Sequence, residues 1–74
     1  MNEGTRGRPN FARWLLSQKF KDDVIGELAR GAAADPHYPV QGGIREVSKR
    51  LNELEADPDM HIALEDAELD WLAL

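Results

Sequence analysis

The sequence predicts an all-α fold, a compact bundle of four or five short helices. Apolar residues recur every three or four positions in several segments, which is the spacing of a buried helix face. Proline and glycine separate these segments, and no stretch of useful length alternates apolar and polar residues as a strand does. The 74 residues give room for one domain, and because the chain has no Cys, its stability must come from helix packing.

The chain divides into an arm and one domain. Residues 1–9 are rich in Gly and Arg without periodicity, so we expect a flexible basic arm there and a single helical domain over residues 10–74. No apolar run approaches the roughly 20 residues that a membrane span requires. Residues 1–10 are polar and lack the apolar stretch of a signal peptide. We therefore expect a cytoplasmic protein without membrane contact.

Capping residues and apolar stripes place two helices in the first half of the chain. Asn10 is expected to cap a first short helix, whose apolar face comprises Phe11, Trp14 and Leu15. Asp22 or Asp23 is expected to cap a second helix, which Asp35-Pro36 ends. The buried stripe of this second helix comprises Val24, Ile25, Leu28, Ala29 and Ala32. Gly26 within it predicts a point where another helix or a Trp packs closely against bare backbone.

A loop over residues 37–43 precedes two further predicted helices. The apolar face of the third comprises Ile44, Val47, Leu51 and Leu54. Glu46 and Arg50, four residues apart, are expected to form an ion pair on its outer surface. Asp57 is expected to cap the fourth helix, with Pro58 at its first position. The core stripe of the fourth helix comprises Met60, Leu64, Ala67, Trp71 and Leu74.

Several of these fragments occur in a recognisable order. They are Phe11-x-x-Trp14-Leu15 with Gln18, the pair Asp22-Asp23 leading into Ile25-Gly26-x-Leu28-Ala29, Asp35 with Tyr38-Pro39, Ile44 and Leu51, and finally Trp71. Over about residues 10–74 this order resembles the YozE-like family of small bacterial proteins. The resemblance implies a SAM-like helical bundle from a bacterium or its phage, and no particular activity. The sequence departs from the family at Asp70, at Leu74 (where a Tyr is common), and in a shorter segment before the third helix.

No residue pattern predicts catalysis, a cofactor or a metal site, so we expect a protein that is not an enzyme. The few Ser and Thr hydroxyls occupy no nucleophile motif. His37 and His61 lack the spacing of zinc ligands, and a calcium-loop register that starts at Asp57 has Ile62 where a Gly is required. Trp14, Tyr38 and Trp71 are interpreted as core residues beside Phe11 and Ile25 rather than as a ligand pocket.

The net charge of −5 is unevenly distributed. Before residue 22, five basic residues stand against the single acid Glu3. From Glu53 to the end there are eight acidic residues and no Lys or Arg. Such asymmetry either marks contacts with partners or lets the two ends attract one another in the folded molecule.

The first candidate contact surface lies on the fourth helix. Leu69 falls about 180° from the core stripe and Leu72 about 120° from it, so both are expected to be exposed. The surface that we predict to bind protein comprises Glu65, Glu68, Leu69, Asp70 and Leu72. An apolar spot with an acidic rim suits a basic protein partner or self-association, and we expect a monomer or a weak homodimer. The identity of the partner does not follow from the sequence.

The second candidate surface is the basic arm with the first helix, which would bind nucleic acid. It comprises Arg6, Arg8, Arg13, Lys19 and Lys21. Cationic side chains on a flexible arm reach phosphates and give salt-dependent affinity. The net charge of −5 opposes binding to a polyanion, and residues 60–74, which contain four acids and no Lys or Arg, are unsuited to the major groove. Nucleic-acid binding is therefore the alternative, and protein binding is the main prediction.

Overall fold

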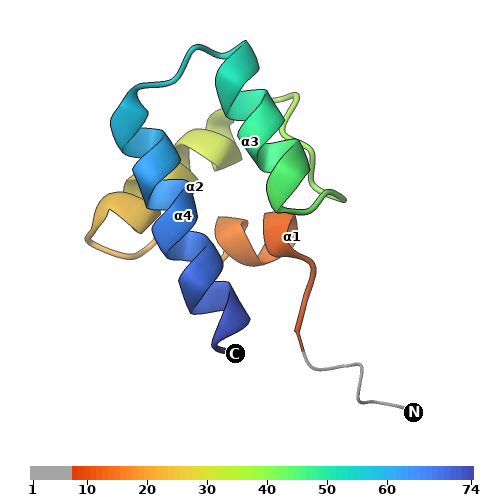
Figure 1. Ribbon diagram of the computed structural model, residues 1–74, viewed down its shortest axis with the longest axis vertical. Helices are drawn as coiled ribbons and strands as arrows, with labels where there is room; N and C mark the ends of the chain where they lie inside the picture. The colour runs from red at the N-terminus through yellow and green to blue at the C-terminus, as the bar shows by residue number, and fades with distance from the viewer. Residues whose placement is uncertain (1–7) are drawn as a thin grey trace.

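A computed structural model describes residues 8–74, which form four α-helices (Figure 1). They are α1 (Phe11–Leu16), α2 (Val24–Ala34), α3 (Ile44–Glu53) and α4 (Pro58–Leu72). The longest helix, α4, contacts each of the other three. No strand is present within the described residues, and the predicted all-α bundle is confirmed. Most of the predicted basic arm, residues 1–7, lies outside the described part of the chain.

The helices begin where side chains satisfy free backbone amides. Asn10 Oδ1 accepts a hydrogen bond from the Arg13 amide at 3.1 Å, and Asp23 Oδ1 accepts one from the Gly26 amide at 3.0 Å. Asp23 is therefore the cap of α2, and not Asp22. α3 begins after Gly43, whose amide donates to Glu46 Oε1 at 2.9 Å. α4 begins with Pro58, as predicted, although the Asp57 side chain makes no capping hydrogen bond.

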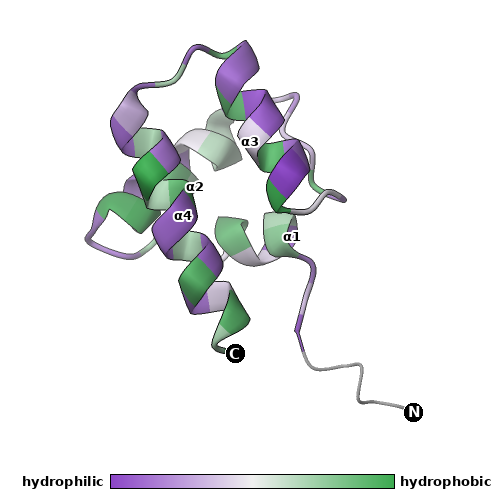
Figure 2. Ribbon diagram, in the orientation of Figure 1, coloured by the Kyte–Doolittle hydropathy of each residue, from purple (hydrophilic) through white to green (hydrophobic). Residues whose placement is uncertain are grey.

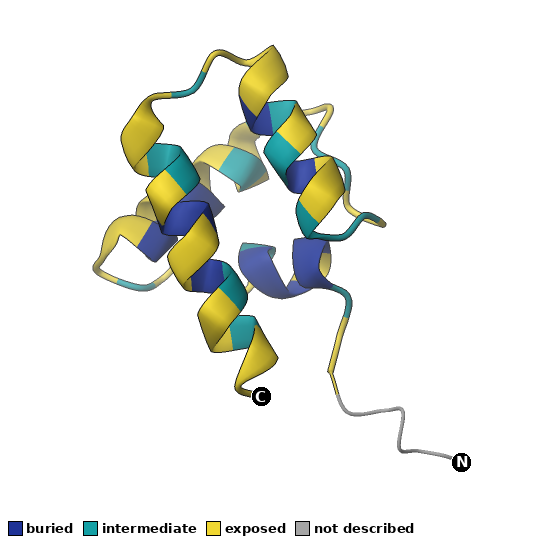
Figure 3. Ribbon diagram, in the orientation of Figure 1, coloured by how far each residue is buried: buried dark blue, intermediate teal, exposed yellow. Residues whose placement is uncertain are grey.

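The core draws residues from all four helices (Figure 3). Its buried members are Phe11, Ala12, Trp14, Leu15, Ile25, Leu28, Ala29, Val47, Leu51, Ala63, Leu64 and Ala67. The Phe11 ring centre lies 5.8 Å from that of Trp14 and 5.6 Å from that of Trp71, the latter edge to face. Tyr38 packs against this cluster, and its hydroxyl donates to the Ala12 carbonyl at 2.8 Å. The interpretation as core residues is confirmed for Trp14, whereas Tyr38 and Trp71 are partly buried and pack against the edge of the core.

Three residues of the predicted core stripes are exposed instead. Val24, Leu54 and Leu74 are 43%, 50% and 62% exposed. Each lies at a helix end, since Val24 is the first residue of α2, Leu54 follows the last residue of α3 and Leu74 lies beyond the end of α4. The stripes therefore continue past the point where a neighbouring helix covers them.

The predicted ion pair between Glu46 and Arg50 is wrong. Arg50 instead donates two hydrogen bonds to the Asp35 carboxylate, from Nε at 2.7 Å and from Nη2 at 2.9 Å, and a third to Glu53. Glu46 is turned toward the start of α3, where it accepts from the Gly43 amide. A fork-like guanidinium and a carboxylate make a stronger paired contact than an exposed pair along one helix. The pair therefore joins α3 to the end of α2.

Candidate functional site

The outer side of α4 carries exposed apolar side chains. Ile62 is 55% exposed, Leu69 67% and Leu72 48%. Seven residues make about two helical turns, so Ile62 and Leu69 lie within about 20° of one another, opposite the buried Leu64 and Ala67. Exposed positions follow the whole helix in Figure 3, and hydrophobic and hydrophilic residues alternate along it in Figure 2. We call Ile62, Leu69 and Leu72 the α4 apolar ridge.

The predicted exposure of Leu69 and Leu72 is confirmed, but Ile62 was not predicted. The signal that would have found Ile62 is its seven-residue spacing to Leu69, which places the two on one face. A helix that is apolar on both its core side and its solvent side has an unpartnered face. Single exposed leucines are ordinary, whereas here three exposed apolar side chains share one side of α4, with Glu65 and Asp66 between Ile62 and Leu69.

Acidic side chains border the ridge on both sides. Glu65 and Asp66 are exposed between Ile62 and Leu69. Glu65 and Glu68 also line a shallow groove of about 510 Å³ between α4 and α3, opposite Arg45 and Lys49. Asp70, on the other side, forms an ion pair with Lys21 at 3.5 Å. The predicted acidic rim is thus present, with one member already engaged within the molecule.

The structure brings two of the predicted nucleic-acid-binding residues onto α4. Arg8 Nη2 donates to the Leu72 carbonyl at 3.2 Å, and its guanidinium carbon lies 5.1 Å from the centre of the Trp71 ring. Lys21 pairs with Asp70, so oppositely charged ends of the chain do meet in the folded molecule. Arg13 and Lys19 are exposed on α1 and on the loop that follows it. Arg6 lies outside the described residues.

The end of α4 is also joined to the start of the domain through the backbone. The Trp71 indole Nε1 donates to the Pro9 carbonyl at 2.8 Å. The Trp71 ring is half-buried, lies nearly perpendicular to the Phe11 ring and has Arg8 stacked on it. Trp71 therefore closes the bundle at the point where the first and last described segments meet.

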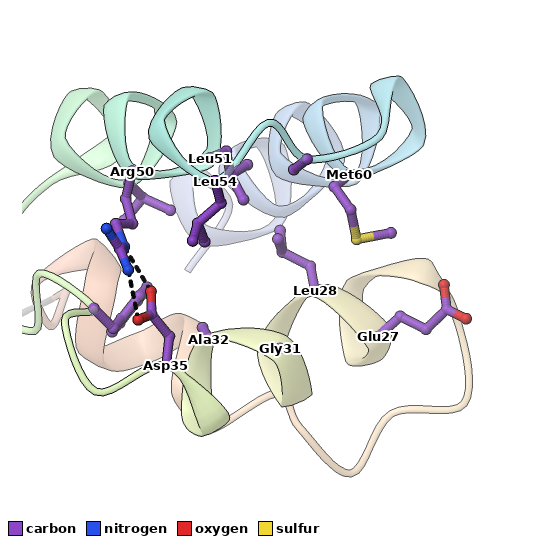
Figure 4. A pocket seen from close by; sticks show the side chains of 12 residues that line it. Glu27, Leu28, Gly31, Ala32, Asp35, Arg50, Leu51, Leu54 and Met60 are labelled. Atoms are coloured by element: carbon purple, nitrogen blue, oxygen red, sulfur yellow. Dashed lines mark hydrogen bonds and ion pairs between the residues drawn. The ribbon is translucent and has the colours of Figure 1, made fainter.

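An apolar recess of about 170 Å³ lies between α2 and the α3–α4 connection (Figure 4). Leu28, Leu54 and Met60 are among the residues that line it, and Gly31 leaves its α2 wall bare. Asp35 and Arg50 close one end, with Glu27 at the other. The sequence did not predict this recess, because its walls come from helices whose mutual packing no local pattern specifies.

Two titratable groups at this recess, Asp35 and Tyr38, are unsuited to proton transfer near neutral pH. Arg50's two hydrogen bonds, and then the His37 amide, lower the pKa of Asp35 to about 2, so the carboxylate stays ionised. Burial raises the pKa of Tyr38 above its ordinary value, so this hydroxyl stays protonated and donates to Ala12. General acid–base catalysis requires a pKa near the working pH, and neither group has one.

Residues 8–74 contain no cluster of three or more His, Asp or Glu side chains placed to bind a metal ion. Over the same range, no helix combines the length and the apolar character that crossing a bilayer demands. Comparison of the chain with protein-family models, with curated proteins and with solved structures finds no match. Function is therefore inferred from the surface chemistry of the described residues.

Proposed function

We propose that the protein is a small, non-catalytic interaction module that binds a basic protein partner through the α4 apolar ridge and its acidic border. The observation that carries this proposal is the aligned pair Ile62 and Leu69, which lie exposed opposite the core side of the same helix. The resemblance to the YozE-like family implies no other activity.

The chemistry of the ridge indicates what kind of partner fits. Completely burying a Leu or Ile side chain contributes roughly 1.5–3 kcal/mol. Ile62 and Leu69 are 55% and 67% exposed, so a partner can gain only part of this at each. Glu65 and Asp66 lie between them and favour a partner whose own apolar side chains are flanked by Lys or Arg. Because the net charge is −5, a partner that is itself acidic must place a local basic patch opposite the ridge.

Affinity capture with matched variants tests the proposal. Leu69→Glu and Ile62→Glu each place a charge on the ridge, and Val40→Glu places the same charge on an exposed apolar residue of the loop before α3. We expect partners captured by the wild type and by Val40→Glu to be lost with both ridge variants. Circular dichroism should show the same helical content for all four proteins, because each substituted side chain is at least 40% exposed. Capture that survives Leu69→Glu and Ile62→Glu would contradict the proposal.

Nucleic-acid binding is the second candidate, because an exposed aromatic lies among cations. Phe20 is 87% exposed between Lys19 and Lys21, and an aromatic ring beside basic groups is a platform for stacking unpaired bases. Against it, Lys21 already pairs with Asp70 and Arg8 already stacks on Trp71. A salt titration with mixed single-stranded oligonucleotides tests this candidate, and no binding at about 50 mM salt would eliminate it.

A further inference from the structure

The loop between α1 and α2, residues 17–23, presents the most exposed large apolar side chain of the described chain. Phe20 is 87% exposed, and the Lys19 ammonium lies 5.3 Å from the centre of its ring. Arg30 Nη1 donates to the carbonyls of Lys19 at 2.9 Å and of Lys21 at 3.1 Å. These two hydrogen bonds hold the backbone on both sides of Phe20. The ring is therefore exposed on an ordered loop, so that less conformational entropy is lost when a partner binds it.

We propose that the occupant of the α4 apolar ridge is the Phe20 loop of a second copy of this chain. The inference rests on the proposed function, because it names the partner of the same surface. Phe20 supplies an exposed apolar side chain with the Lys19 ammonium beside its ring, a combination that the acidic border of the ridge favours. The two surfaces are complementary in both apolar character and charge.

The two surfaces lie side by side on one molecule. The ion pair between Lys21 and Asp70, at 3.5 Å, places the loop directly beside α4 (Figure 1). A two-fold axis between two copies would then place each Phe20 on the ridge of the other, so that the same contact forms twice. Such a reciprocal contact closes into a dimer and leaves no complementary surface for further copies.

The size of this contact predicts a weak dimer. Each half of the interface buries Phe20 against Ile62 and Leu69, which gives less than the roughly 1,600 Å² that a stable complex buries. We expect a dissociation constant of roughly 10 μM to 1 mM, because the contact is small and the net charge of −5 on each copy opposes association.

Sedimentation equilibrium of the purified full chain over a range of concentrations tests the proposal. We expect the wild type and the control Val40→Glu to dimerise equally. Phe20→Glu and Leu69→Glu should each raise the dissociation constant at least tenfold with unchanged circular dichroism. A wild type that stays monomeric at about 1 mM would overturn the inference, as would a Phe20→Glu variant that dimerises normally.

A charge exchange makes the test specific for the reciprocal arrangement. Lys19→Glu alone and Glu65→Lys alone should each weaken the dimer, because each places like charges across both contacts. An equimolar mixture of the two variants should restore it. In the mixed dimer, the carboxylate introduced at position 19 faces the ammonium introduced at position 65, and the native Lys19 and Glu65 face one another in the other contact. Failure of the mixture to restore association would overturn the pairing.

The outcomes also separate this inference from the proposed function. If the wild type is monomeric but Leu69→Glu loses a captured partner, the ridge binds a different protein and only the inference of a second copy fails. If Leu69→Glu affects neither dimerisation nor capture, both fail. If Phe20→Glu abolishes oligonucleotide binding by a monomeric wild type, the loop belongs to the nucleic-acid function and the inference is overturned.

Discussion

Gly26 and Gly31 lie in the same helix, but a side chain would meet different surroundings at each. A Cβ at Gly26 would overlap the carbonyl oxygen of Lys21, whereas a Cβ at Gly31 meets nothing within 4 Å. Gly26→Ala should therefore lower the free energy of unfolding by roughly 1–3 kcal/mol through overpacking. Gly31→Ala should raise it by about 0.5–1 kcal/mol, because alanine loses less backbone entropy in a helix.

Urea unfolding followed by circular dichroism measures both changes, and each variant is the control for the other. The prediction of a close approach at Gly26 is confirmed, but its partner is the Lys21 carbonyl and not another helix or a Trp. A Gly26→Ala variant as stable as the wild type would show that the loop at Lys21 moves away without lowering the free energy of unfolding. The contact between this loop and α2 would then not be rigid.

At Asp35 the ion pair with Arg50 predicts how stability depends on pH. The pKa of Asp35 is about 2 in the folded chain, below its ordinary value of 3.8, first because of Arg50 and then because of the His37 amide. The ionised form is therefore favoured by folding. Its contribution to stability is complete above the unfolded-state pKa and is lost as the pH falls from about 5 toward about 2.

Comparison with Asp35→Asn isolates this contribution from those of the other carboxylates. Asparagine retains an oxygen that accepts from the His37 amide but cannot carry the charge that Arg50 pairs with. The wild type should be the more stable protein at pH 7, and the difference should shrink between about pH 5 and pH 2. Urea midpoints measured across this range check the prediction. A difference independent of pH would mean that the pair contributes no charge-dependent stability.

At the scale of the element, Glu55, just beyond the end of α3, has a left-handed backbone conformation. Glu55 has φ of 55°, and the Ala56 amide donates to the Leu51 carbonyl at 3.0 Å. This is the Schellman arrangement, whose left-handed residue is usually Gly because a Cβ there costs about 1 kcal/mol. Glu55→Gly should therefore raise the free energy of unfolding by up to about 1 kcal/mol.

Glu53→Gly is the matched control for this prediction. It removes the same charge at the last residue of the right-handed helix, where Gly is unfavourable, and also removes the exposed pair with Arg50. We expect it to lower the free energy of unfolding by roughly 1 kcal/mol. Thermal unfolding of the two variants checks the opposite signs. If both variants lost stability, the Glu55 side chain would have to stabilise the turn by more than the backbone strain costs.

Helix existence was predictable from the sequence because it depends on local chemistry. Asn10 and Pro58 start helices for reasons confined to one turn of backbone. Burial at helix ends was not predictable from the sequence, because whether Leu54 or Leu74 is covered depends on where the neighbouring helix stops. Ala63 was left out of the predicted stripe of α4, although it stands four residues before Ala67, about 40° away on the helix, and is fully buried.

At the scale of the whole molecule, the candidate site follows from contacts between distant segments. The spacing of Leu69 relative to the core stripe predicted its exposure, but nothing local placed the Phe20 loop beside α4. That placement depends on the pair of Lys21 with Asp70, which are 49 positions apart in the sequence. Arg50 is a second example. The sequence suggested Glu46, four residues away, as its partner, but Arg50 pairs with Asp35 because tertiary packing brings that better-oriented carboxylate within reach.

The junction of Trp14, Phe11 and Trp71 predicts that the bundle unfolds as one unit. Both indoles contact the Phe11 ring, so α1 and the end of α4 share a single core. Trp71→Phe leaves only the buried Trp14 as a fluorophore, and Trp14→Phe leaves only the half-buried Trp71, whose indole also donates to Pro9. In each variant the urea midpoint from fluorescence should equal that from circular dichroism, although both proteins should be less stable than the wild type by roughly 1–3 kcal/mol. Trp71 emission that shifts at lower urea than the helical signal would show that the terminal contact opens independently of the rest. The surface beside it, where Asp70 meets Lys21, would then not be a fixed platform for a partner.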